Sequence, residues 1–257
     1  MAAPPDPVPP GLHPAAATGF TLMAGAYERG RPGYPPDAVA GLLGALGCPQ
    51  RVLDLAAGTG KLTRLLAAAG LDVVAVEPLP AMRALLEAAL PGVPALAGTA
   101  EAIPLPDAAV DAVLVAQAFH WFEPGRALAE IHRVARPGGG LGLLWNIWDD
   151  ASGWLARVSA RVETATGFAP QFRHGAWRAP VDASPLLQGP LAERCTPWVH
   201  ETSHAEFVGR VASISFVASL PEGDRNALLD EVAALVPLDE PLRVRYRTYT
   251  YSGRCAE

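Results

Sequence analysis

Residues 51–61 read RVLDLAAGTGK and contain two closely spaced glycines, Gly58 and Gly60. Before them, a short apolar run suits a strand buried in a parallel sheet. After them, apolar residues recur at i, i+3, i+4 and i+7, which is helical spacing. The apolar run is Val52, Leu53 and Leu55, and the helical stripe is Leu62, Leu65, Leu66 and Ala69. A glycine turn between a strand and a helix lets a ligand approach the backbone, with free helix N–H groups directed at its negative end.

Two common phosphate-binding loops do not fit this turn. A P-loop requires a glycine five residues before the Gly-Lys pair and a Ser or Thr after it, but these positions hold Leu55 and Leu62. A dinucleotide fingerprint requires a third glycine, where the chain has Thr63. What remains is the pattern D-x-x-x-G-x-G over residues 54–60. A strand-to-helix turn that binds no ligand can share this pattern, so the pattern alone leaves both interpretations open.

The pattern resembles the first motif of the class I S-adenosylmethionine (SAM)-dependent methyltransferases. The usual motif has one more glycine, and this chain has Ala56 in its place. A second feature strengthens the resemblance: Glu77 directly follows the apolar run of residues 73–76. A carboxylate at the end of the second strand of such a fold accepts hydrogen bonds from both ribose hydroxyls. The resemblance therefore implies SAM as the cofactor.

A second stretch, residues 103–122, reads IPLPDAAVDAVLVAQAFHWF and is similar to methyltransferase type 11 domains, including trans-aconitate methyltransferase-like proteins. The ARPGGG turn over residues 135–140 is also typical of that family. The resemblance is detailed over about residues 20–148 and elsewhere extends only to the layout. Near the adenine, the family commonly has an acid directly after a glycine, whereas this chain has Thr99 there and Glu101 two residues later. The cofactor-binding residues that the resemblance implies are Asp54, Ala56, Gly58, Gly60, Glu77, Pro78, Thr99, Ala100, Glu101 and Gln117.

On the acceptor side, His120 is the candidate catalytic residue, because it follows the fourth predicted strand among aromatic neighbours. Its imidazole could take a proton from the acceptor or orient it, or it could simply cap the next helix. Residues 27–35, YERGRPGYP, resemble a segment that closes over the SAM site in the family, although a plain surface loop explains them equally well. The candidate acceptor-binding residues are Tyr27, Arg31, Tyr34, Trp121, Trp145 and Trp148.

The order of these patterns predicts an α/β fold. We expect a doubly wound, mostly parallel Rossmann-like sheet with helices on both faces, and the resemblance implies seven strands with the last one antiparallel. Ligands bind at the carboxyl ends of the strands in such sheets. Residues 1–18 are rich in proline and predict a disordered tail. Residues 19–257 then form one methyltransferase domain, with a lid insertion over about residues 149–190 that is rich in aromatic residues.

The composition limits the class of partner. The chain has 257 residues, of which 20 are Lys or Arg and 26 are Asp or Glu, for a net charge of −6. This balance argues against a non-specific nucleic-acid binder. Nucleic-acid amino-methyltransferases often carry D/N-P-P-Y after the fourth strand, where this chain has QAFH at residues 117–120. A small-molecule acceptor is therefore expected, with neither nucleic acid nor membrane as a partner.

Cysteine usage and hydropathy indicate the compartment. Cys48, Cys195 and Cys255 are odd in number and far apart, which predicts reduced thiols. The sequence has no apolar run of membrane-spanning length and no recognisable signal peptide. We therefore expect a cytoplasmic protein.

Residues 200–204 read HETSH and match the H-E-x-x-H zinc pattern. That chemistry requires both histidines on one face of a continuous helix. Ser203 and Glu206 instead form a capping-box signature, which predicts that a helix begins at Ser203. His200 would then precede the helix, so we expect no metal site.

Taken together, these patterns predict a SAM-dependent methyltransferase that transfers the sulfonium methyl group to a small molecule, with an oxygen acceptor favoured. Two alternatives come from other classes. One is a SAM-binding protein of this fold that does not methylate. The other is an NAD-dependent oxidoreductase, which Thr63 disfavours.

Overall fold

The computed structural model describes residues 28, 30–151, 153–166 and 175–256. The predicted tail over residues 1–18 and the candidate residue Tyr27 lie outside these described residues. In chain order the elements are α2 (Pro36–Ala45), β1 (Arg51–Leu55), α3 (Lys61–Ala68), β2 (Asp72–Val76), α4 (Pro80–Ala89), β3 (Ala95–Leu96), β4 (Val110–Ala116), the 3₁₀ helix η1 (Phe119–Trp121), α5 (Pro124–Val134), β5 (Ala135–Trp148), α6 (Gly153–Thr166), α7 (Arg178–Asp182), β6 (Ala192–Thr202), α8 (His204–Ala212), α9 (Ser215–Ala218), α10 (Glu222–Leu235) and β7 (Leu242–Arg254).

The strands form one seven-stranded sheet in the order β3-β2-β1-β4-β5-β7-β6. Strands β1 to β5 pair in parallel, and β7 runs antiparallel to both β5 and β6. The strand order reverses at β1, which lies between β2 and β4. In open α/β sheets this switch point is where ligands bind, beyond the carboxyl ends of the strands. The predicted fold class is confirmed, including the antiparallel last strand.

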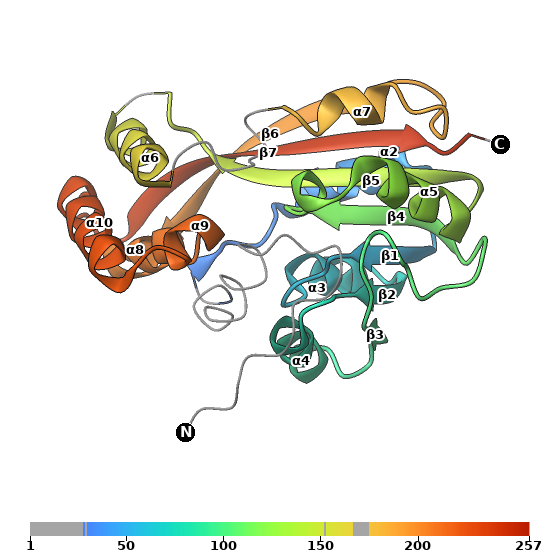
Figure 1. Cartoon of the computed structure of the whole chain (residues 1–257), viewed down its shortest axis with the longest axis horizontal. Coiled ribbons are helices and arrows are strands. Elements are labelled where there is room, and N and C mark those ends of the chain that lie inside the picture. The colour runs from blue at the N-terminus through green and yellow to red at the C-terminus, as the bar shows by residue number, and fades with distance from the viewer. Residues whose placement is uncertain (1–27, 29, 152, 167–174, 257) are drawn as a thin grey trace.

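Helices cover both faces of the sheet (Figure 1). On one face, apolar side chains of α2 and α3 pack on β1 and β4 in a cluster that includes Leu42, Leu66 and Leu114. On the other face, α5 and the region of α7 pack in a cluster that includes Ile131, Val113 and Trp177. The continuous apolar runs of β1 and β4 are explained by this burial on both sides.

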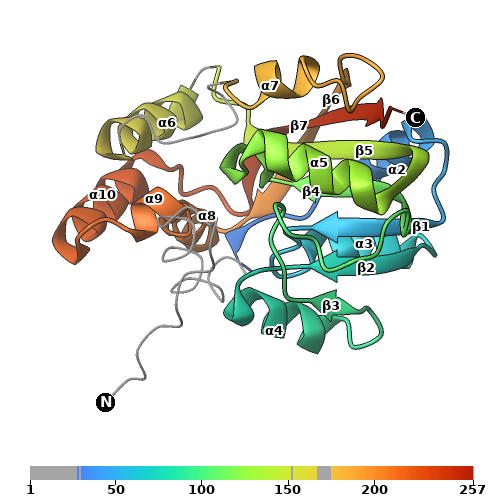
Figure 2. The same ribbon diagram turned by 45° about the vertical axis from the view of Figure 1, so that its right-hand side comes forward.

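A third apolar cluster lies outside the two faces of the sheet. It joins α6, α8, α9 and α10 to the ends of β5 and β7, and its members include Leu155, Phe207, Val232 and Tyr246. These four helices lie together at one end of the molecule in Figures 1 and 2, and we call them the helical cap. Helix α10 packs against both α6 and α8. The cap is therefore built from two insertions, one between β5 and β6 and one between β6 and β7.

The cap does not coincide with the predicted lid segment, residues 149–190. Of that segment, α6 belongs to the cap, whereas α7 packs against α5 over the sheet. Residues 152 and 167–174 lie outside the described residues. Whether any of this segment closes over a ligand stays a prediction. Strand β3 has only two residues, and β5 begins with an irregular stretch that has a register shift opposite Val110 and Ala112.

The histidines of the HETSH stretch are placed as predicted. Helix α8 begins after the N-cap residue Ser203, and Ser203 and Glu206 form a complete capping box. His200 lies on β6, and His204 is the first residue of α8, where its Nε2 lies 3.0 Å from the carbonyl oxygen of Ala233. Within the described part of the chain, no group of three or more His, Cys, Asp and Glu side chains is arranged to hold a metal ion.

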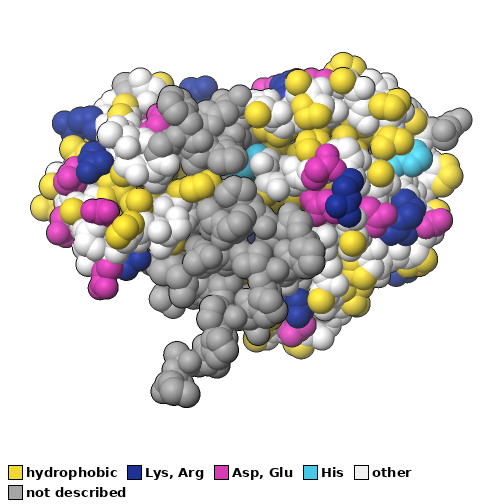
Figure 3. Space-filling model, viewed as in Figure 1, with side chains coloured by type: hydrophobic (Ala, Val, Ile, Leu, Met, Phe, Trp, Pro, Cys, Tyr) yellow, Lys and Arg dark blue, Asp and Glu magenta, His cyan; other side chains and the backbone are white. Residues whose placement is uncertain are grey.

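The described surface mixes charges of both signs. On the face shown in Figure 3, the Lys and Arg side chains of described residues lie among Asp and Glu side chains rather than in a continuous basic stripe. No helix in the described ranges combines the length and the apolar character needed to cross a membrane.

Candidate active site

The glycine loop between β1 and α3 adopts backbone conformations that favour glycine. Gly58 and Gly60 have φ values of +59° and +84°, and Ala56 has φ of +58°. An added Cβ at Gly60 would lie 3.0 Å from Leu86 Cγ, whereas one at Gly58 would meet no heavy atom within 4 Å. The lack of a side chain at Gly60 therefore allows α4 to pack close to the loop, whereas the lack of one at Gly58 leaves open space above it. Ala56 occupies the left-handed region at a cost of roughly 1–2 kcal/mol, which explains why a glycine is usual there.

Asp54 joins the strand before the glycine loop to the helix after it. Its side chain is fully buried, and its Oδ2 accepts a 2.5 Å hydrogen bond from the hydroxyl of Thr63 on α3. Burial raises the pKa of Asp54 to about 6, against the opposing effect of the Thr63 hydrogen bonds. Thr63, which breaks the dinucleotide fingerprint in the sequence, is thus the partner of the motif's acid. At this position Asp54 fixes α3 to β1 and lies beneath the surface of the loop.

Glu77 joins the glycine loop to the end of β2. Its Oε2 accepts a 2.8 Å hydrogen bond from the backbone N–H of Gly58, and its Oε1 accepts one of 2.9 Å from that of Leu79. Only 4% of Glu77 is exposed. Burial raises the pKa of this carboxyl to about 7, and the nearby charge of Asp54 adds to the rise. Each carboxylate oxygen keeps acceptor capacity beyond its one backbone bond, as two ribose hydroxyls would require.

The residues after β3 are placed less clearly for a ligand. Thr99 forms an isolated bridge with Ala102, and Ala100 is buried in the core cluster under α5. Glu101 Oε1 accepts a 3.0 Å hydrogen bond from the N–H of Glu123, which ties it to the start of α5. Pro78 is half-buried directly after Glu77. The predicted cofactor contacts of these four residues stay predictions.

Gln117 marks the carboxyl end of β4 and has a φ of +60°, which is uncommon for a residue with a side chain. Its Nε2 donates a 3.2 Å hydrogen bond to the carbonyl oxygen of Asn146. Asn146 in turn donates from Nδ2 to the Gly33 carbonyl oxygen at 2.7 Å and accepts from the Thr248 hydroxyl at 2.6 Å. Asn146 was not among the predicted site residues, although an amide in the otherwise apolar run of residues 141–148 is a visible signal.

Residue 28 and residues 30–35, here called the strap, connect the glycine loop with the cap. The Glu28 carboxylate accepts a hydrogen bond from the Thr59 hydroxyl and one of 3.1 Å from Arg64, while its carbonyl oxygen accepts one of 2.7 Å from Lys61 Nζ. At the other side, Arg31 Nη2 donates to the Ser213 carbonyl oxygen at 3.3 Å. The strap therefore contacts both α3 and the end of α8.

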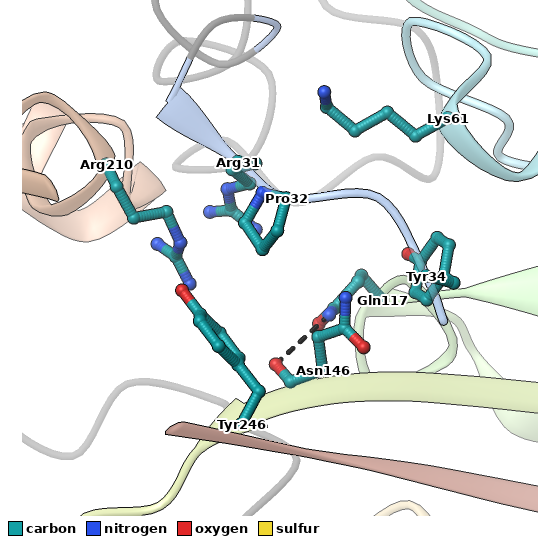
Figure 4. A pocket seen from close by; sticks show the side chains of 8 residues that line it. All are labelled: Arg31, Pro32, Tyr34, Lys61, Gln117, Asn146, Arg210 and Tyr246. Carbon is teal, nitrogen blue, oxygen red and sulfur yellow. Dashed lines mark hydrogen bonds between the residues drawn. The ribbon is translucent and has the colours of Figure 1, made fainter. Parts of the chain in front are cut away.

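A pocket opens between the strap, the strand ends and the cap. Eight residues line it, and they are Arg31, Pro32, Tyr34, Lys61, Gln117, Asn146, Arg210 and Tyr246. Figure 4 shows the Arg210 guanidinium directed toward the Tyr246 hydroxyl, with Arg31 between Arg210 and Lys61 in the view. Arg31, Tyr34 and Gln117 are brought together here as predicted candidates. Arg210 and Tyr246 were missed, because nothing local in the sequence marks α8 or β7 as part of a site. Lys61 was not among the predicted site residues, although it is the last residue of the glycine stretch.

His120 lies in η1, directly after the end of β4, and is half-buried. Its Nδ1 lies 3.2 Å from Trp145 Nε1. An indole N–H can only donate, so Nδ1 must accept, and the proton of the neutral imidazole is on Nε2. Burial, and to a smaller extent the charge of Arg31, lowers the pKa of His120 to about 3. His120 is thus a neutral hydrogen-bond donor at physiological pH, an arrangement that disfavours general-base catalysis.

The three candidate tryptophans have different surroundings. Trp145 is fully buried and stacks on Trp177 with ring centroids 4.7 Å apart, so it supports His120 from behind. Trp148 donates from Nε1 to Ser159 Oγ at 2.6 Å, within the cap cluster. Trp121 is half-buried and stacks on Phe216 of α9 at 5.4 Å. None of the three lines the pocket described above, so their contacts with an acceptor stay predictions.

Comparisons with known proteins agree with this geometry. Residues 53–143 match the methyltransferase domain family. The chain is 45% identical over 220 residues to an uncharacterized methyltransferase of Mycobacterium tuberculosis, covering 84% of this chain and 85% of the relative. It is 34% identical over 236 residues to an uncharacterized methyltransferase-like protein of Schizosaccharomyces pombe, covering 88% and 91%.

A solved structure from Anaeromyxobacter dehalogenans, described as a candidate type II methyltransferase, is similar in fold. It has a TM-score of 0.60 and 27% identity, and the match covers 87% of this chain and 97% of that one. Sequence and fold thus agree over nearly the whole length of the relatives. The chain belongs to the methyltransferase family and is an enzyme of the SAM-dependent class, with S-adenosyl-L-methionine as its cofactor.

Proposed function

We propose that this methyltransferase binds SAM across the glycine loop and methylates a small-molecule acceptor that enters the pocket between strap and cap. The observation that carries the proposal is the Gly58–Glu77 hydrogen bond, which fixes a buried carboxylate at the edge of a loop with open space above it. This arrangement suits a ligand with a ribose diol that lies flat on the loop.

The residues present fit the cofactor in two respects. Gly58 leaves room that any side chain would fill, and both oxygens of Glu77 are oriented by backbone N–H groups. Bound SAM supplies an activated methyl group on a sulfonium, which is already a good leaving group. What the protein has to add is alignment of the acceptor atom with that methyl and exclusion of water.

His120 contributes orientation in this proposal. As a neutral imidazole with the proton on Nε2, it can donate a hydrogen bond to an acceptor oxygen, while Trp145 holds the ring from the other side. A hydrogen bond of this kind positions an oxygen for attack without removing its proton. Acceptors of low pKa, such as carboxylic acids, are already deprotonated at neutral pH and require no base. This favours methylation at oxygen and agrees with the lack of a titrating base at His120.

Two measurements test the proposal. Isothermal titration calorimetry with SAM, S-adenosylhomocysteine and NAD should show binding of the first two and none of the third. A screen for S-adenosylhomocysteine formation over carboxylic acids, phenols and amines should then identify a class of acceptor. Tight binding of NAD would contradict the cofactor assignment. SAM binding with no turnover on any acceptor class would favour the alternative of a SAM-binding protein that does not methylate. A cytoplasmic location stays a prediction.

A further inference from the structure

The lining of the pocket has an unusual charge. Three of its eight residues are cations that come from three separate elements: Arg31 from the strap, Lys61 from the start of α3 and Arg210 from the last turn of α8. The other five are Pro32, Tyr34, Gln117, Asn146 and Tyr246, so the lining holds no carboxylate. Cationic and neutral polar groups that converge on one pocket favour an anionic ligand.

The three cations differ in their surroundings. Lys61 forms an ion pair with Glu28, with 3.4 Å between Nζ and Oε2. The contacts of the two arginines include neutral groups: Arg31 donates to the backbone carbonyl of Ser213, and the Arg210 guanidinium lies 5.2 Å from the centre of the Trp148 ring. Both of these contacts orient a guanidinium group through a partner that carries no net charge.

In Figure 4 the Arg210 guanidinium is directed toward the Tyr246 hydroxyl, and Arg31 lies between Arg210 and Lys61 in the view. Like charges that line one pocket repel each other, and a bound anion offsets that repulsion. The planar guanidinium fork matches the geometry of carboxylate and phosphate groups better than an ammonium does. The Tyr246 hydroxyl, which lies beside Arg210 in the same view, adds a hydrogen-bond donor for an anionic oxygen.

SAM itself accounts for only part of this positive charge, because it carries a single carboxylate. Lys61 and the strap lie next to the glycine loop, the side of the pocket at which SAM is proposed to bind. Arg210 belongs to the cap, on the opposite side of the pocket in Figure 4. We propose that Arg210, with Tyr246, binds an anionic group of the methyl acceptor, a carboxylate or a phosphate, so that the enzyme acts on anionic small molecules. This inference rests on the proposed function of the same site.

The test uses the full-length protein saturated with S-adenosylhomocysteine and titrated with succinate in one arm and inorganic phosphate in the other. The parent is compared with Arg210→Met, which keeps an apolar stem beside Trp148, and with Arg210→Lys, which keeps the charge. Arg157→Met, which removes an exposed charge from α6 of the same cap, is the matched control. If Arg210→Met does not fold, Tyr246→Phe is used in its place, because it removes only a hydroxyl group.

We expect the parent to bind one of the two anions, and Arg210→Met to bind it about tenfold more weakly or worse. Arg210→Lys should recover part of the loss, Arg157→Met should behave like the parent, and SAM affinity should stay within about twofold throughout. Preference for succinate or phosphate assigns the anion as carboxylate or phosphate. Tyr246→Phe, where used, should lower the affinity for the anion by about threefold.

Three outcomes would overturn the inference: no binding of either anion by the parent at about 10 mM, equal binding by Arg210→Met, or a parallel loss of SAM affinity in Arg210→Met. The last outcome would assign Arg210 to the cofactor. Failure of the parent to bind SAM is a different result, because it contradicts the proposed function before the anion is added.

Discussion

The glycine-loop side of the site and its cap side are built in opposite ways. On the loop side, Asp54 and Glu77 find their hydrogen-bond partners within one continuous stretch of the chain, residues 54–79, and backbone N–H groups hold the Glu77 carboxylate. On the cap side, Arg210 and Tyr246 come from elements that meet only through long-range packing. Local hydrogen bonds fix the cofactor side, whereas tertiary contacts create the acceptor side. We therefore expect substitutions on the loop side to change cofactor affinity and those near the cap to change acceptor kinetics.

The largest effect is expected at the open side of the glycine loop. Gly58→Val should weaken SAM binding by about 10³-fold or more (about 4 kcal/mol), because a branched side chain would fill the space above the loop and oppose a φ of +59°. Gly70→Val is a matched control: Gly70 has a similar φ of +83° and open space around its Cβ, but lies at the far end of α3. Calorimetry on both folded variants measures the difference. Equal SAM affinity in Gly58→Val and the parent would show that this loop does not hold the cofactor.

Removal of the Glu77 carboxylate, which is proposed to accept hydrogen bonds from the ribose hydroxyls, should have the next largest effect. Glu77→Ala is expected to weaken SAM binding by about 10–100-fold, since charge-assisted hydrogen bonds contribute about 1.5–3 kcal/mol. Glu87→Ala removes an exposed acid from the neighbouring helix α4 and should leave the affinity unchanged. Titration calorimetry compares the three proteins. A Glu77→Ala variant that binds SAM like the parent would refute the ribose assignment.

The same carboxylate should make the stability of the ligand-free protein depend on pH. Burial raises the pKa of Glu77 from 4.5 to about 7, so between these values the folded state binds more protons than the unfolded state. The free energy of unfolding therefore falls as the pH rises from about 4.5 to 7. Relative to Glu77→Ala, the parent should lose on the order of 2 kcal/mol between pH 4.5 and pH 8. Urea unfolding at both values measures this difference, and parallel profiles would exclude an elevated pKa.

A smaller effect is expected at His120. His120→Gln keeps a side-chain donor and removes the ring, so the KM for the acceptor should rise about fivefold to tenfold while kcat falls less. With a pKa of about 3, His120 stays neutral above pH 5, so its replacement should leave the pH profile of kcat/KM unchanged between pH 6 and 8. His132→Gln, on α5, controls for the loss of a histidine. If kcat instead falls by about 10²-fold or more and the pH profile of kcat/KM changes shape, His120 acts as a general base.

The smallest expected effect is dynamic. SAM binding should slow amide exchange in the strap, because the strap contacts α3 beside the glycine loop. The predicted lid over residues 149–190 adds a sharper question: protection in α6 without protection in α7 would assign closure to the cap, since these two helices lie on different parts of the molecule. Hydrogen exchange with and without SAM measures both. Equal exchange in the two states would argue against any lid.

The loop side could be predicted from the sequence because its signals are local. The strand, glycine turn and helix are continuous in the chain, and Glu77 is the first residue after β2. Even here, Thr63 was understood only as a missing glycine, whereas the structure makes it the hydrogen-bond partner of Asp54. The identity of a side chain's partner depends on where two elements meet, which spacing alone does not encode.

The cap side could not be predicted, for a related reason. Helices α6 and α10 pack together although a strand and three further helices separate them in the chain, and no motif marks either helix. His120 was visible as a candidate, but its protonation state depends on Trp145, a residue of the next strand. Trp145 itself was expected in the acceptor site, and its complete burial follows from packing against α7 and β7.

The β6–β7 hairpin has one more consequence. Thr202 and Leu242, the residues on either side of the second cap insertion, are direct partners in the antiparallel ladder, so the whole of residues 203–241 leaves and re-enters the sheet through neighbouring backbone positions. Paired Cα atoms in such ladders are only about 4.5–5.5 Å apart, a gap that a short hairpin turn also spans. Segments with adjoining ends can be exchanged with little disturbance to the host domain. The fold thus offers a graft point, at which one catalytic scaffold can receive different recognition modules during evolution or in protein engineering.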